Sequence, residues 1–232
     1  MTVGIMQPYF LPYIGYFQLI KAVDLFVVYD RIKYTKKGWI NRNRYLLNGA
    51  DETFSLPLKK GSDALDVVER ELAAEFDRSK LLSQLKGAYR RAPHFDQVLP
   101  LLERIVLHDD ANLFCFIHHS LVSVCEHLAI ETEIRVSSTV PFDEDLKAQD
   151  KVLGICKALG AQRYINAIGG TDLYRREDFA GHDIELRFLR PRAFEYTQFD
   201  NKFVPWLSIV DVLMFNPIEV VRECLERNYD LV

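Results

Sequence analysis

Polar and aromatic side chains follow the first apolar run of the chain, where they could hold a phosphate or a sugar. Residues 2–6 form that run, and the loop after it contains two prolines, which interrupt any helix or ladder because proline lacks an N–H. A helical pattern starts at Gly15 and ends near Ala22. Because open α/β sheets bind ligands where a strand ends and a helix begins, we expect a nucleotide or phosphate site here. Its candidate residues are Gln7, Tyr9, Pro12, Tyr13, Gly15 and Tyr16.

A second group of candidate residues lies in the basic segment 31–44. This segment combines the aromatic ring of Trp39, which can stack on a ligand, with the planar hydrogen-bond donors of Asn41, Arg42 and Asn43. Such a combination suits a phosphate or a carboxylate. The alternative is a solvated charged loop. Asn48-Gly49 then predicts a β-hairpin between residues 39–48 and 52–58. Its basic residues include Lys33, Lys36, Lys37, Arg42 and Arg44, and the candidate substrate-binding residues are Lys36, Trp39, Arg42 and Asn43.

Two later strands also end in polar residues. Residues 131–138 and 161–170 read as strands, and in a parallel sheet their carboxyl ends would lie on the same edge as the first loop, forming one cleft. The pair Gly169-Gly170 would allow a positive φ or close backbone approach, although a glycine pair is also typical of a simple turn. These ends supply the remaining substrate-binding candidates, namely Ser137, Ser138, Asn166, Gly169, Gly170 and Tyr174.

No motif of covalent catalysis occurs in the sequence. G-x-S-x-G, the Walker loop and GxGxxG are all absent. Asp24, Asp30 and Asp211 could serve as general bases, although Asp24 and Asp211 flank apolar runs and could equally be caps. His118 and His119 are adjacent on a predicted helix and point about 100° apart, so we expect no metal site there. A site of this composition favours catalysis by positioning and hydrogen bonding.

The order of predicted elements indicates an α/β fold with a Rossmann-like parallel sheet. Strands and helices alternate over the first thirty and the last hundred residues, which favours parallel pairing with right-handed crossovers. We expect a single α/β domain over 1–232 with a mostly helical insertion at 62–130. Helices are predicted from Ser79, over 98–107, from the cap Asn112 to Leu128, and over 147–159. Residues 171–179 read as a short helix capped by Thr171, and closing helices over 208–216 and 217–228 could complete the core or form a homodimer face.

Composition narrows the classes of partner. The chain has 29 basic and 33 acidic residues and a net charge of −4, so nucleic acid is not an expected partner. No apolar run reaches 18 residues, and the start lacks a signal-peptide pattern. We therefore expect no membrane span and a cytoplasmic location.

The opening stretch resembles nucleotidylyltransferases of the HIGH superfamily. Phe10, Pro12, Gly15, Leu19, Ile20 and Asp24 fit that layout, and Ser137-Ser138-Thr139 is superficially similar to its later Ser-Ser-Thr signature. Tyr13 and Tyr16 replace the two histidines that stabilise phosphates in that superfamily, and tyrosine carries no charge for that role. The resemblance implies the nucleotidylyltransferase-like (HUP) fold more strongly than the reaction.

A second resemblance covers nearly the whole chain. The segments MQPYFLPYIGYFQLI, WINRNR, YINAIGG-x-x-LY and EYTQF…LSIVDVLMFN are similar to the WbqC-like family. That resemblance implies a role in bacterial surface-polysaccharide (O-antigen) biosynthesis, with acyl or aminoacyl transfer to a nucleotide-linked amino sugar as the expected reaction. The cofactor stays open, with ATP or a nucleotide sugar as the candidate. The alternatives are a nucleotidylyltransferase with a rebuilt phosphate site and a non-catalytic nucleotide-sugar-binding subunit.

Overall fold

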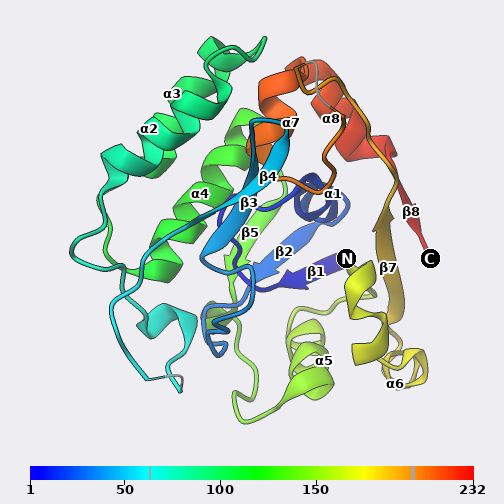
Figure 1. Cartoon of the computed structure of the whole chain (residues 1–232). Coiled ribbons are helices and arrows are strands. Elements are labelled where there is room, and N and C mark those ends of the chain that lie inside the picture. The colour runs from blue at the N-terminus through cyan, green and yellow to red at the C-terminus, as the bar shows by residue number, and fades with distance from the viewer. Residues whose placement is uncertain (63, 200–201) are drawn as a thin grey trace.

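A computed structural model describes residues 1–62, 64–199 and 202–232, and its centre is a six-stranded sheet (Figure 1). The strand order is β5-β2-β1-β6-β7-β8, and every pair is parallel except β7 with β8. The strands are β1 (Thr2–Met6), β2 (Leu25–Val28), β5 (Glu133–Val136), β6 (Arg163–Ala167), β7 (Glu185–Pro191) and β8 (Tyr229–Leu231). The expected α/β fold with a mostly parallel sheet is confirmed, and its arrangement is Rossmann-like.

The strand order reverses next to β1. From β1 the chain passes through α1 (Ile14–Lys21) to β2, and later to β5 on the same side. It then crosses through α5 (Ala148–Ala158) to β6, which pairs with the other edge of β1. A crevice therefore opens between the carboxyl ends of β1 and β6, which is where doubly wound sheets bind their ligands.

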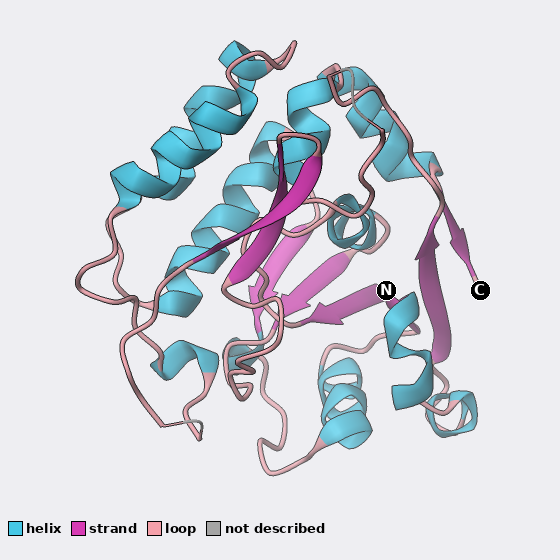
Figure 2. Ribbon diagram, in the orientation of Figure 1, coloured by secondary structure: helices cyan, strands magenta, loops and turns pink. Residues whose placement is uncertain are grey.

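Alternation along the strands divides the apolar core into two layers. Val3 and Ile5 of β1 pack with α5 and with α6 (Arg176–Ala180), whereas Phe26 and Val28 of β2 face the opposite layer. That second layer includes α1, α4 (Leu113–His127), α7 (Ile209–Phe215) and α8 (Ile218–Arg227). Figure 2 shows helices on both faces of the sheet. The sheet is thus covered on both sides, as a parallel sheet requires.

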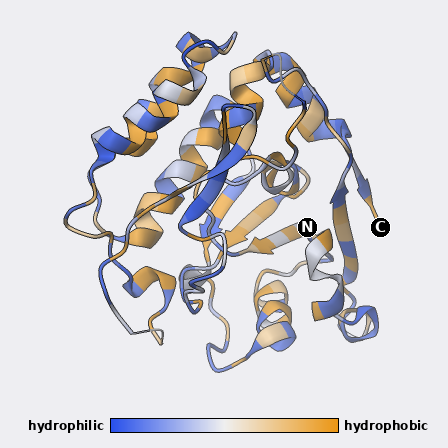
Figure 3. Ribbon diagram, in the orientation of Figure 1, coloured by the Kyte–Doolittle hydropathy of each residue, from blue (hydrophilic) through white to orange (hydrophobic). Residues whose placement is uncertain are grey.

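A hairpin and four helical elements lie between β2 and β5. The hairpin joins β3 (Arg42–Leu47) to β4 (Ala50–Ser55) through Asn48 and Gly49, whose φ values are 51° and 80°. Two consecutive positive φ values fit the Asn-Gly hairpin turn, so that prediction is confirmed. Figure 3 shows the hairpin mostly in hydrophilic colours, in contrast to β1 and β2. The helical elements are the 3-10 turn η1 (Val67–Glu69), α2 (Arg78–Tyr89), α3 (Phe95–Val106) and α4.

These helices agree with the predicted ones. The side chain of Asn112 accepts a hydrogen bond from the Cys115 N–H at 3.0 Å, which confirms the expected cap of α4. Many of their apolar side chains belong to the same buried cluster as those of α1 and β2. The division of the chain into one domain with an insertion stays a prediction. No helix in the described part of the chain is long and apolar enough to cross a membrane.

The short strand β8, which the sequence did not predict, pairs antiparallel with β7. Two local predictions are wrong. Thr171 does not cap a helix, because a 3-10 turn, η3 (Ile168–Leu173), already spans it and α6 begins only at Arg176. Residues 137–139 form the 3-10 turn η2 rather than extending β5, because the Ser137 hydroxyl and the Ser138 N–H bind Asp30, just after β2, instead of a neighbouring strand.

Candidate functional site

A cavity of about 510 Å³ opens at the point where the strand order reverses. Its floor comes from the loop after β1, the turn after β6 and the end of β7. The β3 hairpin with its lead-in and the segment before α7 form the other walls. The lining residues are Tyr9, Pro12, Tyr13, Trp39, Asn43, Arg44, Ile168, Arg190, Pro191 and Trp206. Its size falls within the range of small-molecule sites.

The loop after β1 is held in place by hydrogen bonds to its backbone. Leu11 has a φ of 45°, in the left-handed region that is unfavourable for a branched side chain. Its carbonyl accepts hydrogen bonds from Asn43 Nδ2 at 2.8 Å and from Ser208 Oγ at 2.7 Å. The next carbonyl, of Pro12, accepts one from the Ile209 N–H at 2.9 Å. The hairpin and α7 therefore both anchor this strained loop.

Gly15 allows two cavity walls to approach the start of α1. A Cβ at this position would lie 2.4 Å from the Tyr13 ring and 2.7 Å from Cγ of Pro191. No side chain fits at those distances without a shift of its neighbours. Gly15 does not itself line the cavity, but the positions of Tyr13 and Pro191 depend on its missing side chain.

Two tryptophans give the cavity its aromatic character. Trp39 and Trp206 are 44% and 55% exposed, which is unusual for such large apolar side chains. Trp206 has a φ of 60°, and the centroid of its ring lies 6.0 Å from that of Tyr13, edge to face. Strain of this kind persists where the surrounding structure fixes it, and it is concentrated at binding sites.

Two arginines supply the positive charge of the lining. Arg44 bonds to Asp51 at 3.0 Å through Nη1 and to the carbonyl of Trp206 at 3.1 Å through Nη2, while its buried Nε has no hydrogen-bond partner. Arg190 lies 3.7 Å from Asp230 and is otherwise exposed. A bound anion could therefore be met from both sides of the cavity.

The lining tyrosines are hydrogen-bond donors rather than bases. Burial raises the pKa of Tyr9, and burial with a smaller effect of Tyr9 raises the pKa of Tyr13. Both phenols therefore keep their protons at neutral pH. No carboxyl, imidazole or thiol is among the residues that line the cavity in the described part of the chain.

Four predicted site residues do not line the cavity, although two of them hold neighbouring segments in place. Tyr16 is buried in the core, and its hydroxyl donates to the carbonyl of Gln7 at 2.8 Å, so it cannot reach a phosphate. Arg42 donates to the carbonyls of Gly38 and Lys37, and its guanidinium lies 5.5 Å from the centroid of Trp39. Gln7 is half-buried, and Lys36 is exposed. Neither of these two side chains lines the cavity.

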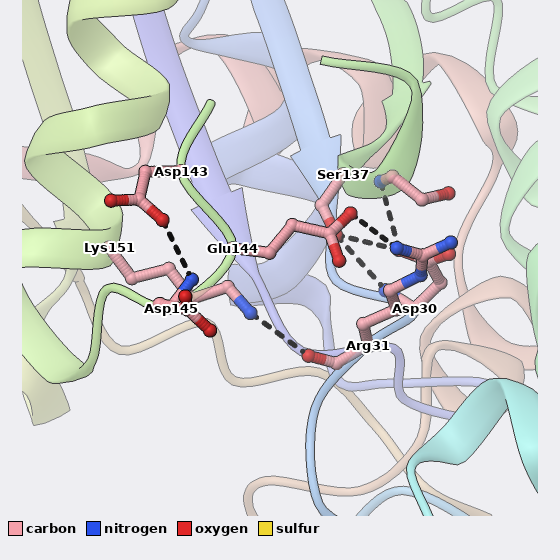
Figure 4. A network of polar contacts seen from close by, with 8 residues as sticks. Asp30, Arg31, Ser137, Asp143, Glu144, Asp145 and Lys151 are labelled. Atoms are coloured by element: carbon pink, nitrogen blue, oxygen red, sulfur yellow. Dashed lines mark hydrogen bonds and ion pairs between the residues drawn. The ribbon is translucent and has the colours of Figure 1, made fainter. Parts of the chain in front are cut away.

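Ser137 belongs to a separate polar network around Asp30 (Figure 4), and the backbone of Ser138 bonds to the same carboxyl. The hydroxyl of Ser137 donates to Asp30 at 2.7 Å, and the N–H of Ser138 donates to the same oxygen at 3.1 Å. Burial opposes ionisation of Asp30, but these hydrogen bonds outweigh it and lower the pKa of the carboxyl. Nearby, Arg31 pairs with Glu144. The expectation that all three polar strand ends form one cleft is therefore wrong.

The end of β6 contributes less than predicted. Ile168 lines the cavity, but Asn166, Gly169, Gly170 and Tyr174 do not. The positive-φ glycines of the described chain are Gly49 and Gly160, so of the two expected alternatives at Gly169 and Gly170 a positive φ is excluded. Gly170 is instead required by packing, because a Cβ there would lie 2.4 Å from Nδ2 of Asn166.

The three carboxylates considered as bases lie away from the cavity. Asp24 accepts a hydrogen bond from the Thr2 N–H at 2.7 Å, at the opposite end of β1. Asp211 is fully buried and accepts hydrogen bonds from Tyr89, Tyr196 and Gln198 at 2.7–2.9 Å. Burial raises its pKa, and the three donors oppose that rise. Asp211 therefore organises the core beside the site.

Five lining residues were not among the candidates from the sequence. They are Arg44, Ile168, Arg190, Pro191 and Trp206. Arg44 lies in the basic segment recognised above, but alternation along β3 places it on the same face as Arg42, so the strand period could not have separated the two. The sequence gives no sign that Trp206 is exposed and lines a cavity, because its position depends on a backbone conformation with a positive φ.

Comparison with known proteins shows which family this chain is similar to. The model of the WbqC-like protein family matches residues 7–223. The uncharacterized protein Rv1507c of Mycobacterium tuberculosis (strain ATCC 25618 / H37Rv) is 26% identical over 217 residues, covering 92% of this chain and 93% of that protein. No solved structure matches the chain.

Proposed function

Since the chain belongs to the WbqC-like protein family, we propose that it is a sugar-modifying transferase of bacterial surface-polysaccharide (O-antigen) biosynthesis. Its substrate is a nucleotide-linked amino sugar, and the reaction is acyl or aminoacyl transfer. The amino nitrogen forms a bond to the acyl carbon, the bond from that carbon to its leaving group breaks, and the amine proton leaves with the leaving group.

One observation carries the proposal. The cavity at the switch point combines four aromatic rings with Arg44 and Arg190, and it lies where a Rossmann-like sheet binds nucleotides. Aromatic faces suit a base or the apolar face of a sugar, and the guanidinium groups suit a diphosphate. Because the described lining lacks a titratable base or a covalent nucleophile, the enzyme accelerates transfer by positioning.

The test is product formation from a panel of nucleotide-linked amino sugars and acyl donors, followed by mass spectrometry. Arg190→Gln should reduce turnover, whereas Arg192→Gln should not. The two are closely matched, because each side chain is 55% exposed and pairs with Asp230, but only Arg190 lines the cavity. Equal effects of the two substitutions would contradict the assigned role of the cavity.

The same composition also favours a second candidate function, a non-catalytic nucleotide-sugar-binding subunit. Tight binding of nucleotide sugars without any product from the donor panel would support this candidate. A nucleotidylyltransferase is less favoured, because Tyr16 occupies the position of a phosphate-binding histidine and is buried in the core. Release of pyrophosphate from ATP or CTP with a sugar phosphate would reverse that preference.

A further inference from the structure

The unoccupied hydrogen-bonding groups on the cavity's described side chains are few and are mostly donors, namely the Tyr13 hydroxyl and the indole N–H groups of Trp39 and Trp206. The amide of Asn43 is already used, since Nδ2 donates to Leu11 and Oδ1 accepts from the Arg44 N–H at 2.8 Å. Two of the three guanidinium nitrogens of Arg44 are bonded within the protein. Pro12, Ile168 and Pro191 contribute no side-chain donor or acceptor.

The small number of free hydrogen-bonding groups decides which part of a nucleotide sugar fits the cavity. A pyranose ring has several hydroxyl groups, and each one costs free energy when it is buried without partners. A nucleobase exposes large flat faces with few polar atoms and is stabilised by stacking on aromatic side chains. Trp39, Trp206 and Tyr13 provide such side chains, and both tryptophans are exposed.

The two charged side chains of the described lining are both cationic. The Arg44 side chain is 29% exposed, so its positive charge can attract a phosphate in the cavity. Arg190, on the end of β7, adds a second positive charge to the same cavity. The base and its phosphates together account for the aromatic and the charged components of the lining.

We propose that this cavity is a nucleobase site, with the diphosphate at Arg44 and Arg190 and the sugar outside it. The inference rests on the proposed function and deepens it. Recognition comes from stacked area, because the one side-chain amide of the described lining, that of Asn43, is already bonded within the protein. The site therefore takes purine nucleotides more tightly than pyrimidine nucleotides and distinguishes poorly between adenine and guanine.

Calorimetric titration of the full chain with ADP, GDP, UDP, ribose 5-phosphate and N-acetylglucosamine 1-phosphate tests this proposal. We expect ADP and GDP to bind alike, and about tenfold or more tightly than either sugar phosphate, as the loss of one stacked base implies. Trp206→Ala should weaken ADP binding about tenfold and leave the weak binding of the sugar phosphates unchanged. Trp206→Phe should retain most of the affinity for ADP, because it keeps an aromatic face.

Leu173→Ala is the matched control, since Leu173 is 66% exposed and does not line the cavity. Sugar phosphates that bind as tightly as ADP, or a Trp206→Ala variant that weakens both classes equally, would overturn the nucleobase assignment. In that case product formation from a nucleotide sugar would still support the transferase. Conversely, base-dependent binding without product would leave the nucleobase site intact and refute the transferase.

Discussion

Tyr89→Phe, which removes only the hydroxyl oxygen of Tyr89, should lower the stability of this protein strongly. The Tyr89 ring is fully buried, and its hydroxyl accepts a hydrogen bond from the Leu46 N–H and donates one to Asp211, both at 2.9 Å. It thereby joins the hairpin to α7. Removing it leaves a buried N–H unpaired and takes one donor from a buried carboxyl, for which we expect a loss of about 3 kcal/mol. At this chain length the melting temperature should fall by roughly 6–12 °C.

Urea unfolding followed by circular dichroism measures this loss, with Tyr45→Phe as the control. Tyr45 is 2% exposed, so the same atom is removed from an equally buried ring. Its hydroxyl accepts a hydrogen bond from the exposed side chain of Gln84, which can turn to water instead. The control should therefore cost less than about 1 kcal/mol. Equal midpoints for the two variants, at unchanged m-values, would refute the role assigned to Tyr89.

Three further predictions follow from the site and its surroundings. Gly15→Ala should displace the Tyr13 ring, weaken ADP binding by about tenfold and lower the stability by about 1–3 kcal/mol. Gly87→Ala on α2 is its control: a Cβ there meets nothing within 4 Å, so this change should stabilise the protein in thermal melts. Asp211 has a pKa raised above 3.8, so its contribution to stability is lost as pH rises through that raised value, and Asp211→Asn should abolish this loss in urea titrations from pH 4 to 7. The pKa of Asp30 is lowered, so the advantage of the native protein over Asp30→Asn should disappear as pH falls below about 4. If the stability difference between the native protein and one of these variants did not change with pH, the pKa shift assigned to that aspartate would be contradicted.

The sheet and its helices were predictable because each is specified locally. Apolar β-branched runs such as residues 25–28 become buried strands, and Asn112 caps α4 through its own side chain. Gly160 follows α5 with a φ of 66°, as a glycine after a helix does. The three-residue strand β8 gave no such signal, since it is defined only by its pairing with β7.

The cavity lining was less predictable because it depends on tertiary contacts. Arg190 and Arg192 have the same residue type, the same exposure and the same acidic partner, yet only Arg190 lines the cavity. Asn43 resembles a ligand-binding side chain in the sequence, but most of its amide is used to hold Leu11. Trp206 reaches the cavity through a backbone conformation that the sequence does not indicate.

The polar strand ends separate according to the position of each strand in the sheet. β1 and β6 flank the switch point, and the residues that follow them, such as Tyr9 and Ile168, line the cavity. β5 lies two strands away from β1, a distance of roughly 10 Å, and its Ser137 binds Asp30 instead. All these ends lie on one edge, so polarity after a strand does not by itself identify a ligand contact. Polar residues after a strand identify a ligand contact only when that strand borders the point where the strand order reverses. The ends of the other strands are covered by protein groups from their own connections.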